Sequence, residues 1–362
     1  MKLIELSYTD TNWELRNLCL GDVNLLVGQN ATGKSRTLST IDLLYKMITQ
    51  KRDLNWGSKW ELKFINHKKQ SIVYQFATSQ RKEGVTFEKI TVDGRQVLYR
   101  GETSKRNMPI TTLYSSLSKK TEEIFPPKDK LVLHVRRDVK NYPFLEDLVE
   151  WAEQSYGFKF GNISPYSGFN QQEYDLLTSI EDIPALYSSL QKENKLKIIA
   201  EFNEIGYAIT DISIQQKGDL VVINVQEEGL TKKHPHYNLS QGMFRTLSVI
   251  IYLEYLISRK RPATVIIDDL CEGLDYARAS KLSEIVFAKC KKHNIQLIAT
   301  SNDSFLMDKI DIEYWNVLVR KGKIVEVINY QSHPELFEQF RFTGLSNFDF
   351  FASDYLSKTE IS

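Results

Sequence analysis

The period of the hydrophobic positions changes several times along the chain, and each change predicts a different element. Residues 23–28 form a short apolar run that ends in glycine, and the segment after it repeats apolar side chains at the spacing of a helix face. Between residues 60 and 100 apolar and polar side chains alternate instead, and Asp93-Gly94 is typical of a tight hairpin turn. The N-terminal part is therefore predicted to form a strand, a loop and a helix, followed by an antiparallel sheet.

The C-terminal half is predicted to alternate helices with strands. The expected elements are hairpins over 210–226 and 317–328, turning at Lys217-Gly218 and Lys321-Gly322, helices over 241–259 and 276–292, and strands over 265–267 and 295–300. Strands that alternate with helices at this spacing indicate a doubly wound, mostly parallel sheet. The expected fold class is α/β, with an additional antiparallel β subdomain.

The length leaves two arrangements open, and the order of the predicted elements indicates that the middle of the chain is inserted into one large domain. At roughly 150 residues per domain, 362 residues correspond to about two domains, or to one domain that carries an insertion. Residues 1–104 and 201–362 are expected to form the two halves of one α/β head, and residues 105–200 an inserted, mainly helical region.

Composition and charge narrow the class of protein. With 42% hydrophobic and 26% charged residues, the chain has the composition of a folded globular protein. Lys and Arg number 47 against 46 Asp and Glu, so the net charge is +1 and no global basic field indicates nucleic acid. Two local clusters, Arg136-Arg137 with Lys140 and Arg259-Lys260-Arg261, are either solvated surface or weak contacts to a phosphate backbone.

The remaining composition indicates a cytoplasmic location. The cysteines Cys19, Cys271 and Cys290 are scattered singly, which excludes a disulfide framework or a Cys-x-x-Cys zinc pair and fits a reducing compartment. No window reaches about 18 uncharged apolar residues, so no contact with a membrane is expected. The most apolar stretch, 247–257, is interrupted by Glu254 and therefore fits a buried helix.

The strongest motif lies between the first predicted strand and helix, where the chain satisfies G-x-x-x-x-G-K-[ST]. In such a loop, glycines allow backbone N–H groups to surround phosphates at the positive end of the helix, a lysine adds a point charge, and the hydroxyl of the last residue ligates Mg²⁺. The predicted metal ligand of the loop is Ser35. The residues expected to contact the nucleotide are Gly28, Gln29, Asn30, Ala31, Thr32, Gly33, Lys34, Ser35 and Arg36.

Two carboxylates follow the apolar strand at 265–267. A P-loop enzyme places the group that holds Mg²⁺ at such a strand end, so Asp268 is the candidate for the metal and Asp269 for orienting the attacking water. A second interpretation is helix capping, in which Asp269 or Asp275 caps the following helix.

A third motif, Leu239-Ser240-Gln241-Gly242-Met243, precedes the long apolar helix, although serine and glycine are also ordinary residues at a helix start. Together, the phosphate loop, this string, Ile266-Ile267-Asp268-Asp269 and the strand end at Asn302 follow one another in an order that resembles the ABC-type ATPases, in particular their RecF, SMC and OLD branch. The resemblance covers residues 1–50 and 200 to about 330.

The resemblance implies roles for further residues. Ser240, Gln241 and the Gly242 amide match the ABC signature, which in the family contacts the γ-phosphate of an ATP held by the opposite subunit. Asp275 matches the D-loop at the dimer interface. Asn302 stands where ABC transporters carry a switch histidine. The implied catalytic residues are Lys34, Asp269 and Asn302, the cofactors are ATP and Mg²⁺, and the assembly is a homodimer with ATP at its interface.

Two departures from the family pattern bear on turnover. The usual glutamate after the metal-binding aspartate is here Asp269, one methylene shorter, as in RecF, which puts rapid hydrolysis in doubt. Glu272 is an alternative that could reach the water, or an ordinary surface residue. The exchange of histidine for Asn302 removes a titratable contact to the γ-phosphate.

Three functions remain open at this point. The motifs look closest to stand-alone AAA-type ATP-binding proteins of bacterial anti-phage systems, in which ATP-bound dimers control a separate effector such as a nuclease. The chain length and Asp268-Asp269 also resemble a RecF-like repair ATPase, and a slowly hydrolysing ATP-sensing scaffold is a third alternative. Too few residues follow Asn302 for a nuclease domain, so the chain itself is not expected to cut nucleic acid.

Two smaller features have alternative interpretations. The aromatic segment 348–351 is either part of the core or a surface for a partner. His234-Pro235-His236 is expected to lie in a surface loop, because no carboxylate neighbours the histidines to complete a metal site.

Overall fold

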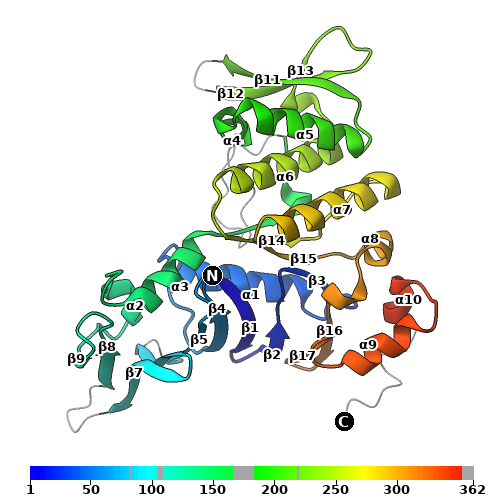
Figure 1. The fold of residues 1–362 in the computed structure, drawn as a ribbon. Helices are drawn as coiled ribbons and strands as arrows, with labels where there is room; N and C mark the ends of the chain where they lie inside the picture. The colour runs from blue at the N-terminus through cyan, green and yellow to red at the C-terminus, as the bar shows by residue number, and fades with distance from the viewer. Residues whose placement is uncertain (82, 104–108, 166–182, 218–219, 353–362) are drawn as a thin grey trace. The chain divides into compact units, whose positions relative to one another are not determined.

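The computed structural model describes residues 1–81, 83–103, 109–165, 183–217 and 220–352, which are distributed over two compact units (Figure 1). The first unit contains residues 1–21, 28–155 and 316–332, and the second contains residues 22–27, 156–315 and the segment from 333 onward. The chain therefore passes between the units several times, so that residues distant in sequence meet within each of them.

The first unit is an antiparallel sheet with helices. Its sheet order is β16-β17-β2-β1-β4-β5-β6-β7-β8-β9. The bounds are β1 (Lys2–Thr9), β2 (Glu14–Cys19), α1 (Lys34–Ile48), β4 (Lys59–Ile65), β5 (Ser71–Thr78), β6 (Val85–Val92), β7 (Arg95–Thr103), β8 (Pro109–Tyr114), β9 (Thr121–Ile124), α2 (Val132–Val135), α3 (Pro143–Glu153), β16 (Trp315–Lys321) and β17 (Ile324–Asn329). Within this order only β17 and β2 are paired in parallel among the pairs for which a register is given.

Local sequence signals account for much of this unit. The predicted turn Asp93-Gly94 is confirmed, because β6 and β7 pair with Val92 opposite Arg95. Helix α1 places Leu38, Ile41, Leu44 and Met47 on its fully buried face, as the helical spacing predicts. Strands β8 and β9 lie within the stretch 105–200 and extend the antiparallel sheet beyond β7, so the helical part of that stretch begins after them.

The second unit combines a parallel sheet, a small antiparallel sheet and most of the long helices. Its strands are ordered β10-β14-β15-β3 and β11-β12-β13. The bounds are β3 (Val23–Val27), β10 (Ser155–Lys159), η1 (Phe160–Asn162), α4 (Ile183–Ser189), α5 (Lys192–Glu204), β11 (Ile209–Lys217), β12 (Leu220–Glu227), β13 (His234–Pro235), η2 (His236–Asn238), α6 (Gln241–Ser258), β14 (Ala263–Asp268), α7 (Tyr276–Lys292), β15 (Ile295–Thr300), α8 (Ser304–Lys309), η3 (Ile312–Tyr314), α9 (Pro334–Arg341) and α10 (Asn347–Ala352).

The parallel strands position the polar groups that follow them. Every residue of β3, β14 and β15 is buried, which explains why these strands are nearly continuous apolar runs. The pairing is parallel, with Ile267 opposite Ala299 and Ala299 opposite Leu25. The carboxyl ends of the three strands therefore lie at one edge of the sheet.

A buried ionic cluster explains the charge inside the apolar stretch of α6. Lys289 of α7 donates to both carboxylate oxygens of Glu201 on α5, at 2.6 and 2.7 Å, and also to Glu254 of α6. Burial would raise the pKa of Glu254, but hydrogen bonds from Lys289 and Asn194 outweigh it and lower that pKa below its usual range. The cluster ties three helices together, and α6 is the buried helix that the sequence predicts.

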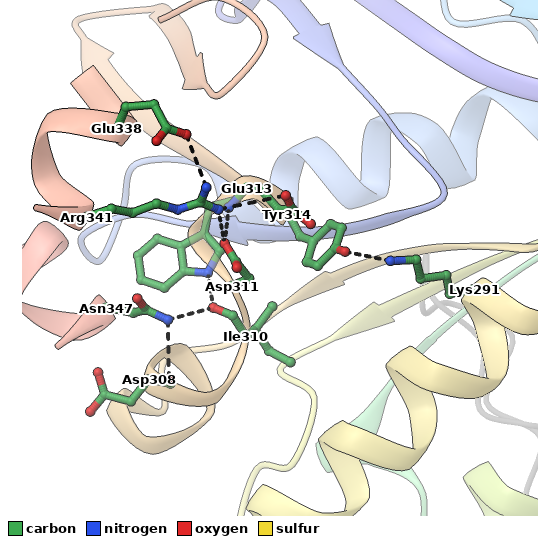
Figure 2. A network of polar contacts seen from close by, with 10 residues as sticks. Lys291, Asp308, Ile310, Asp311, Glu313, Tyr314, Glu338, Arg341 and Asn347 are labelled. Carbon is green, nitrogen blue, oxygen red and sulfur yellow. Dashed lines mark hydrogen bonds and ion pairs between the residues drawn. The ribbon is translucent and has the colours of Figure 1, made fainter. Parts of the chain in front are cut away.

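The C-terminal segment packs onto the second unit through aromatic side chains and a polar network. Phe350 is fully buried against Trp315, Phe337 and Phe340, which decides for this residue in favour of core packing. Figure 2 shows the network, in which the Arg341 guanidinium contacts three carboxylates and the Asn347 amide donates to two backbone oxygens. The carboxylates are those of Asp311, Glu313 and Glu338, and the backbone oxygens are those of Asp308 and Ile310.

Among the helices of the described ranges, none combines the length and the hydrophobicity that crossing a lipid bilayer requires.

Candidate nucleotide-binding and hydrolysis site

Close packing explains both glycines of the phosphate loop, which lies in the first unit. Gly33 has a φ of 106°, and a Cβ there would lie 2.1 Å from Cη2 of Trp13. A Cβ on Gly28 would lie 2.5 Å from Oγ1 of Thr32 and 3.0 Å from the backbone oxygen of Leu318. A larger residue at either position would displace the loop, so the glycine spacing of the motif is a packing requirement here.

The lysine of the motif lies at the base of the loop. Lys34 is only 7% exposed, and its ammonium donates to the backbone oxygens of Gly28 at 2.5 Å and Gln29 at 3.2 Å. The rim of the loop is exposed, namely Gln29, Asn30, Ala31, Ser35 and Arg36. The positive charge is thus held beneath an accessible turn of backbone.

The start of α1 has the features of an anion site. The helix begins at Lys34 and has 15 residues, its first turn contains no acidic residue, and Gly33 at the N-cap offers no side-chain cap. The N–H groups of a first helical turn point along the axis and carry the positive end of the helix dipole. These observations on the loop fit a phosphate group held by Lys34 and the amides around it.

Trp13, which sequence reasoning did not single out, supports the loop from below. Its ring is fully buried, Gly33 packs against it, and the Arg36 guanidinium lies 4.6 Å from its centroid. Arg36 is also paired with Asp10 at 3.4 Å. The signal in the sequence was a tryptophan among polar neighbours, immediately before β2.

In the second unit, the paired aspartates meet the end of β15. The Thr300 hydroxyl donates to Oδ1 of Asp268 at 2.6 Å and accepts from the backbone N–H of Asp269 at 2.8 Å. The Asn302 side-chain amide donates to Oδ1 of Asp269 at 3.0 Å. The structure therefore brings together Asp268, Asp269 and Asn302, three predicted residues, and adds Thr300 as their shared partner.

The backbone at Asp269 gives a reason for aspartate in place of glutamate. Asp269 has a φ of 52°, in the left-handed region, where aspartate and asparagine are several-fold enriched over other non-glycine residues. Cys271 and Gly273 are also left-handed, with φ values of 72° and 78°, so the chain winds tightly from the strand end to α7. The short side chain matches this turn.

The capping interpretations are confirmed for Ser240 and Asp275. Ser240 is the N-cap of α6 and accepts from the N–H of Met243 at 3.2 Å. Asp275 is the N-cap of α7 and accepts from the N–H of Arg278, a hydrogen bond that lowers the pKa of its carboxyl. The N-cap of α7 is therefore Asp275 and not Asp269. Both caps leave the residues exposed, which is compatible with a further contact.

Arg245 connects the start of α6 to the segment that follows Asp269. Its guanidinium donates to the backbone oxygens of Glu272 and Ile163, at 3.2 Å each, and to that of Gly161. Gly242 also approaches this segment, because a Cβ there would lie 3.0 Å from Leu274 Cδ2. The sequence offered no signal for the contacts to residues 161, 163 and 272, since their acceptors are backbone atoms. A further acceptor of Arg245 is the side-chain oxygen of Gln241, at 3.4 Å.

The prediction for the histidine pair is wrong for one residue. His236 is buried, its ring stacks 5.5 Å from that of Phe244, and its Nδ1 accepts from the N–H of Ile223 at 3.2 Å. Burial lowers the pKa of His236, so it is a packed core residue and not part of a surface loop. Within the described ranges no group of three or more His, Cys, Asp or Glu side chains could hold a metal ion.

One of the basic clusters is partly engaged. Arg137 forms a two-bond pair with Glu146, at 2.8 and 2.7 Å, which neutralises its charge. Arg259, Lys260 and Arg261 are exposed at the end of α6.

Comparison with known proteins agrees with these motifs. Residues 23–308 match a family described as "AAA domain, putative AbiEii toxin, Type IV TA system". No curated protein matches the chain in sequence. Solved structures that resemble it include an Smc head bound to the C-terminal winged-helix domain of ScpA (TM-score 0.52, 10% identity, covering 91% of this chain and 97% of that one). Another is the Pyrococcus furiosus Smc head with an extended coiled coil, bound to the C-terminal domain of ScpA (TM-score 0.54, 10% identity, 94% and 99%).

The fold and the phosphate-loop motif define the chain as a P-loop protein with the fold of SMC heads. The chain belongs to the AAA-domain family whose model it matches. The predicted fold class is confirmed, and the expected resemblance to SMC proteins is confirmed at the level of the fold.

Proposed function

We propose that the protein is an ATP-binding and ATP-hydrolysing switch that dimerises around two ATP molecules and thereby controls a separate effector. The hydrogen-bonded set of Asp268, Thr300, Asp269 and Asn302 carries this proposal, because it supplies the carboxylates that hydrolysis needs and fixes their orientation.

For binding, the phosphate loop supplies the charge and the donors. Lys34 and the first amides of α1 would hold the β- and γ-phosphates, and the exposed rim from Gln29 to Arg36 would surround them. Ser35 and Asp268 would hold Mg²⁺, which when bound neutralises phosphate charge and polarises the γ-phosphate. The donor set fits a hard cation, since both candidates offer oxygen.

For hydrolysis, Asp269 would orient the attacking water. Its Oδ1 accepts from Asn302, so the carboxylate is held in one orientation, and Thr300 fixes the backbone beneath it. The side-chain amide of Asn302 does not gain or lose a proton near neutral pH, so Asn302 acts as a positioning residue for Asp269. The shorter carboxylate supports slow turnover.

For dimerisation, the exposed start of α6 would face an ATP of a second subunit. Ser240, Gln241 and the Gly242 amide would contact its γ-phosphate, in the manner that the resemblance to the ABC signature implies. Arg245 supports a coupling between this contact and hydrolysis, because it joins the start of α6 to the turn after Asp269. Asp275, the exposed N-cap of α7, would lie at the same dimer interface, as its match to the D-loop implies.

Control of an effector is proposed from the family description, which names a putative toxin of a toxin–antitoxin system. We propose that a toxic output comes from a separate protein such as a nuclease, which this ATPase controls. A role in bacterial anti-phage or genome defence is part of the same proposal.

The alternative, a RecF-like repair ATPase, requires DNA binding by the chain itself. The net charge of +1 and the pairing of Arg137 with Glu146 support only weak binding, strongly dependent on salt. Nanomolar binding to duplex DNA in physiological salt would favour the repair ATPase. ATP binding without measurable turnover would favour the sensing scaffold.

Calorimetry with Mg·ATP and phosphate release test the central proposal. We expect Lys34→Ala to weaken binding about 10- to 100-fold, because a hydrogen bond to a charged group contributes about 1.5–3 kcal/mol. Asp269→Asn should bind as the wild type does and lose turnover. Equal affinity of the wild type and Lys34→Ala would show that the loop is not the nucleotide site.

A further inference from the structure

The hairpin of β16 and β17 supports the phosphate loop of the same unit at two points. The backbone oxygen of Leu318 lies so close to Gly28 that a Cβ there would approach it to 3.0 Å. Two residues further along β16, Arg320 donates from Nη1 to the backbone oxygen of Ala31 at 3.1 Å, across 289 positions of sequence. One strand thus touches the first and the fourth residue of the loop.

Arg320 itself is held in place by its own hairpin and by Trp13. Its Nε donates to the backbone oxygen of Gly322 at 2.8 Å, and its guanidinium carbon lies 6.0 Å from the Trp13 ring centroid. Gly33 packs against the same ring, and the guanidinium carbon of Arg36 lies 4.6 Å from its centroid. A guanidinium fixed at two points presents its remaining N–H groups in a rigid geometry, which lysine cannot reproduce.

The acceptor of Arg320 lies at an unusual backbone conformation. Ala31 has a φ of 66°, in the left-handed region that residues with a Cβ rarely adopt. Because the peptide unit is planar, holding the Ala31 oxygen also fixes the orientation of the Thr32 N–H, which closes a turn onto the Gln29 oxygen at 3.3 Å. The hydrogen bond from Arg320 therefore stabilises the turn in the middle of the loop.

We propose that Arg320 is a positioning residue for nucleotide binding, which holds Ala31 in its left-handed conformation and so keeps the phosphate loop in its binding shape. This inference rests on the proposed binding of ATP by the loop. A loop that adopts its binding shape only part of the time has its apparent affinity reduced by that fraction. Loss of Arg320 would therefore weaken binding without removing any group that contacts phosphate.

The test measures the Kd of Mg·ATP by calorimetry for five variants beside the wild type, one of which, Arg320→Lys, keeps only the charge. Arg320→Met removes the contact, and Lys321→Met removes one positive charge from the neighbouring position of the same hairpin. Arg320→Met combined with Ala31→Gly restores easy access to a left-handed φ, because glycine adopts it without a steric cost. Lys34→Ala reports on the loop as the nucleotide site.

We expect Arg320→Met to raise Kd about tenfold, as for a loop that is competent about one tenth of the time. Lys321→Met should stay within about twofold of the wild type, and the double variant should recover to within about threefold. Recovery by Ala31→Gly is a result that a merely structural role of Arg320 would not produce. The melting temperature without nucleotide should be the same for Arg320→Met and Lys321→Met.

Three results would overturn the proposal: equal Kd values for Arg320→Met and Lys321→Met, a double variant that binds no tighter than Arg320→Met, or full affinity in Arg320→Lys, which keeps only the charge. Each of these leaves the proposed function intact as long as Lys34→Ala still weakens binding. If the wild type and Lys34→Ala bind Mg·ATP equally, the proposed function itself fails.

Discussion

The side-chain amide of Asn302 donates a hydrogen bond to Oδ1 of Asp269 at 3.0 Å, which joins the residue after β15 to the carboxylate proposed for hydrolysis. The contact gives Asn302, which stands at the position of the switch histidine, a role that does not require the titratable ring of histidine. It holds a carboxylate whose backbone is already restricted to the left-handed region.

Asn302→Ala should lower kcat for ATP about tenfold and leave KM unchanged, because the loss of a hydrogen bond to a charged group frees the Asp269 carboxylate to rotate. Phosphate release at saturating Mg·ATP measures this. Asn302→Asp provides a comparison of equal size, in which two carboxylates face each other, and it should reduce kcat further. A kcat of Asn302→Ala equal to that of the wild type would mean that Asp269 needs no partner.

Asp269→Asn should accumulate an ATP-bound dimer. Asparagine tolerates the left-handed φ of 52° as aspartate does, so the backbone is kept while the carboxylate is lost. Light scattering with Mg·ATP should show a dimer for Asp269→Asn and a monomer when Ser240→Arg is added, because a bulky side chain blocks the exposed start of α6. A monomer of Asp269→Asn saturated with ATP would argue against the proposed dimer.

An exposed aromatic pair next to Asp275 and Asp303 should contribute to this dimer. Tyr276 and Phe305 are 53% and 50% exposed, and their rings meet edge to face at 4.8 Å. Full burial of such a ring contributes about 1.5–3 kcal/mol, and these rings are already half buried, so Phe305→Ser should weaken ATP-dependent dimerisation up to about tenfold.

Phe342→Ser is the matched control for the aromatic pair, since Phe342 is 89% exposed and follows α9. This variant should dimerise as the wild type does, and both variants should keep their affinity for Mg·ATP as monomers. Equal loss of dimerisation in the two variants would point to a general effect of surface hydrophobicity.

Stability should depend on pH through Glu88, which is buried within the first unit. Burial raises the pKa of Glu88 from 4.5 to about 7, although hydrogen bonds from Tyr74 and from the Val132 amide oppose the shift. Because the folded state then binds the proton more tightly, the contribution of Glu88 is complete below pH 4.5 and is lost as the pH rises to about 7. The loss amounts to at most about 3 kcal/mol.

His134 acts in the opposite sense over an overlapping range. Burial lowers its pKa from 6.5 to about 4, so its contribution grows as the pH rises through this interval. Denaturant unfolding of the wild type and of Glu88→Gln between pH 4.5 and 8 isolates the contribution of Glu88. Both proteins contain His134, so its contribution cancels in the difference between their free energies of unfolding. The free energy of unfolding of the wild type should fall relative to that of Glu88→Gln as the pH rises, and parallel curves would contradict the assignment.

Elements whose signals are local could be predicted from the amino-acid sequence. The helical spacing from Leu38 to Met47 defines the buried face of α1, Asp93-Gly94 defines a turn, and α7 begins at Tyr276 after a capping aspartate, because backbone propensity and periodicity act over a few residues. The phosphate loop and the paired aspartates were recognisable for the same reason, since each motif is contiguous.

Which distant groups act together follows from the three-dimensional fold. Thr300 joins Asp268 to Asp269, Arg245 reaches backbone oxygens near residues 161 and 272, and Arg320 reaches the oxygen of Ala31. Every residue offers a backbone oxygen, so no pattern of side chains marks the ones that are used. Their selection depends on the order of strands in each sheet, which brings segments hundreds of residues apart within hydrogen-bond distance.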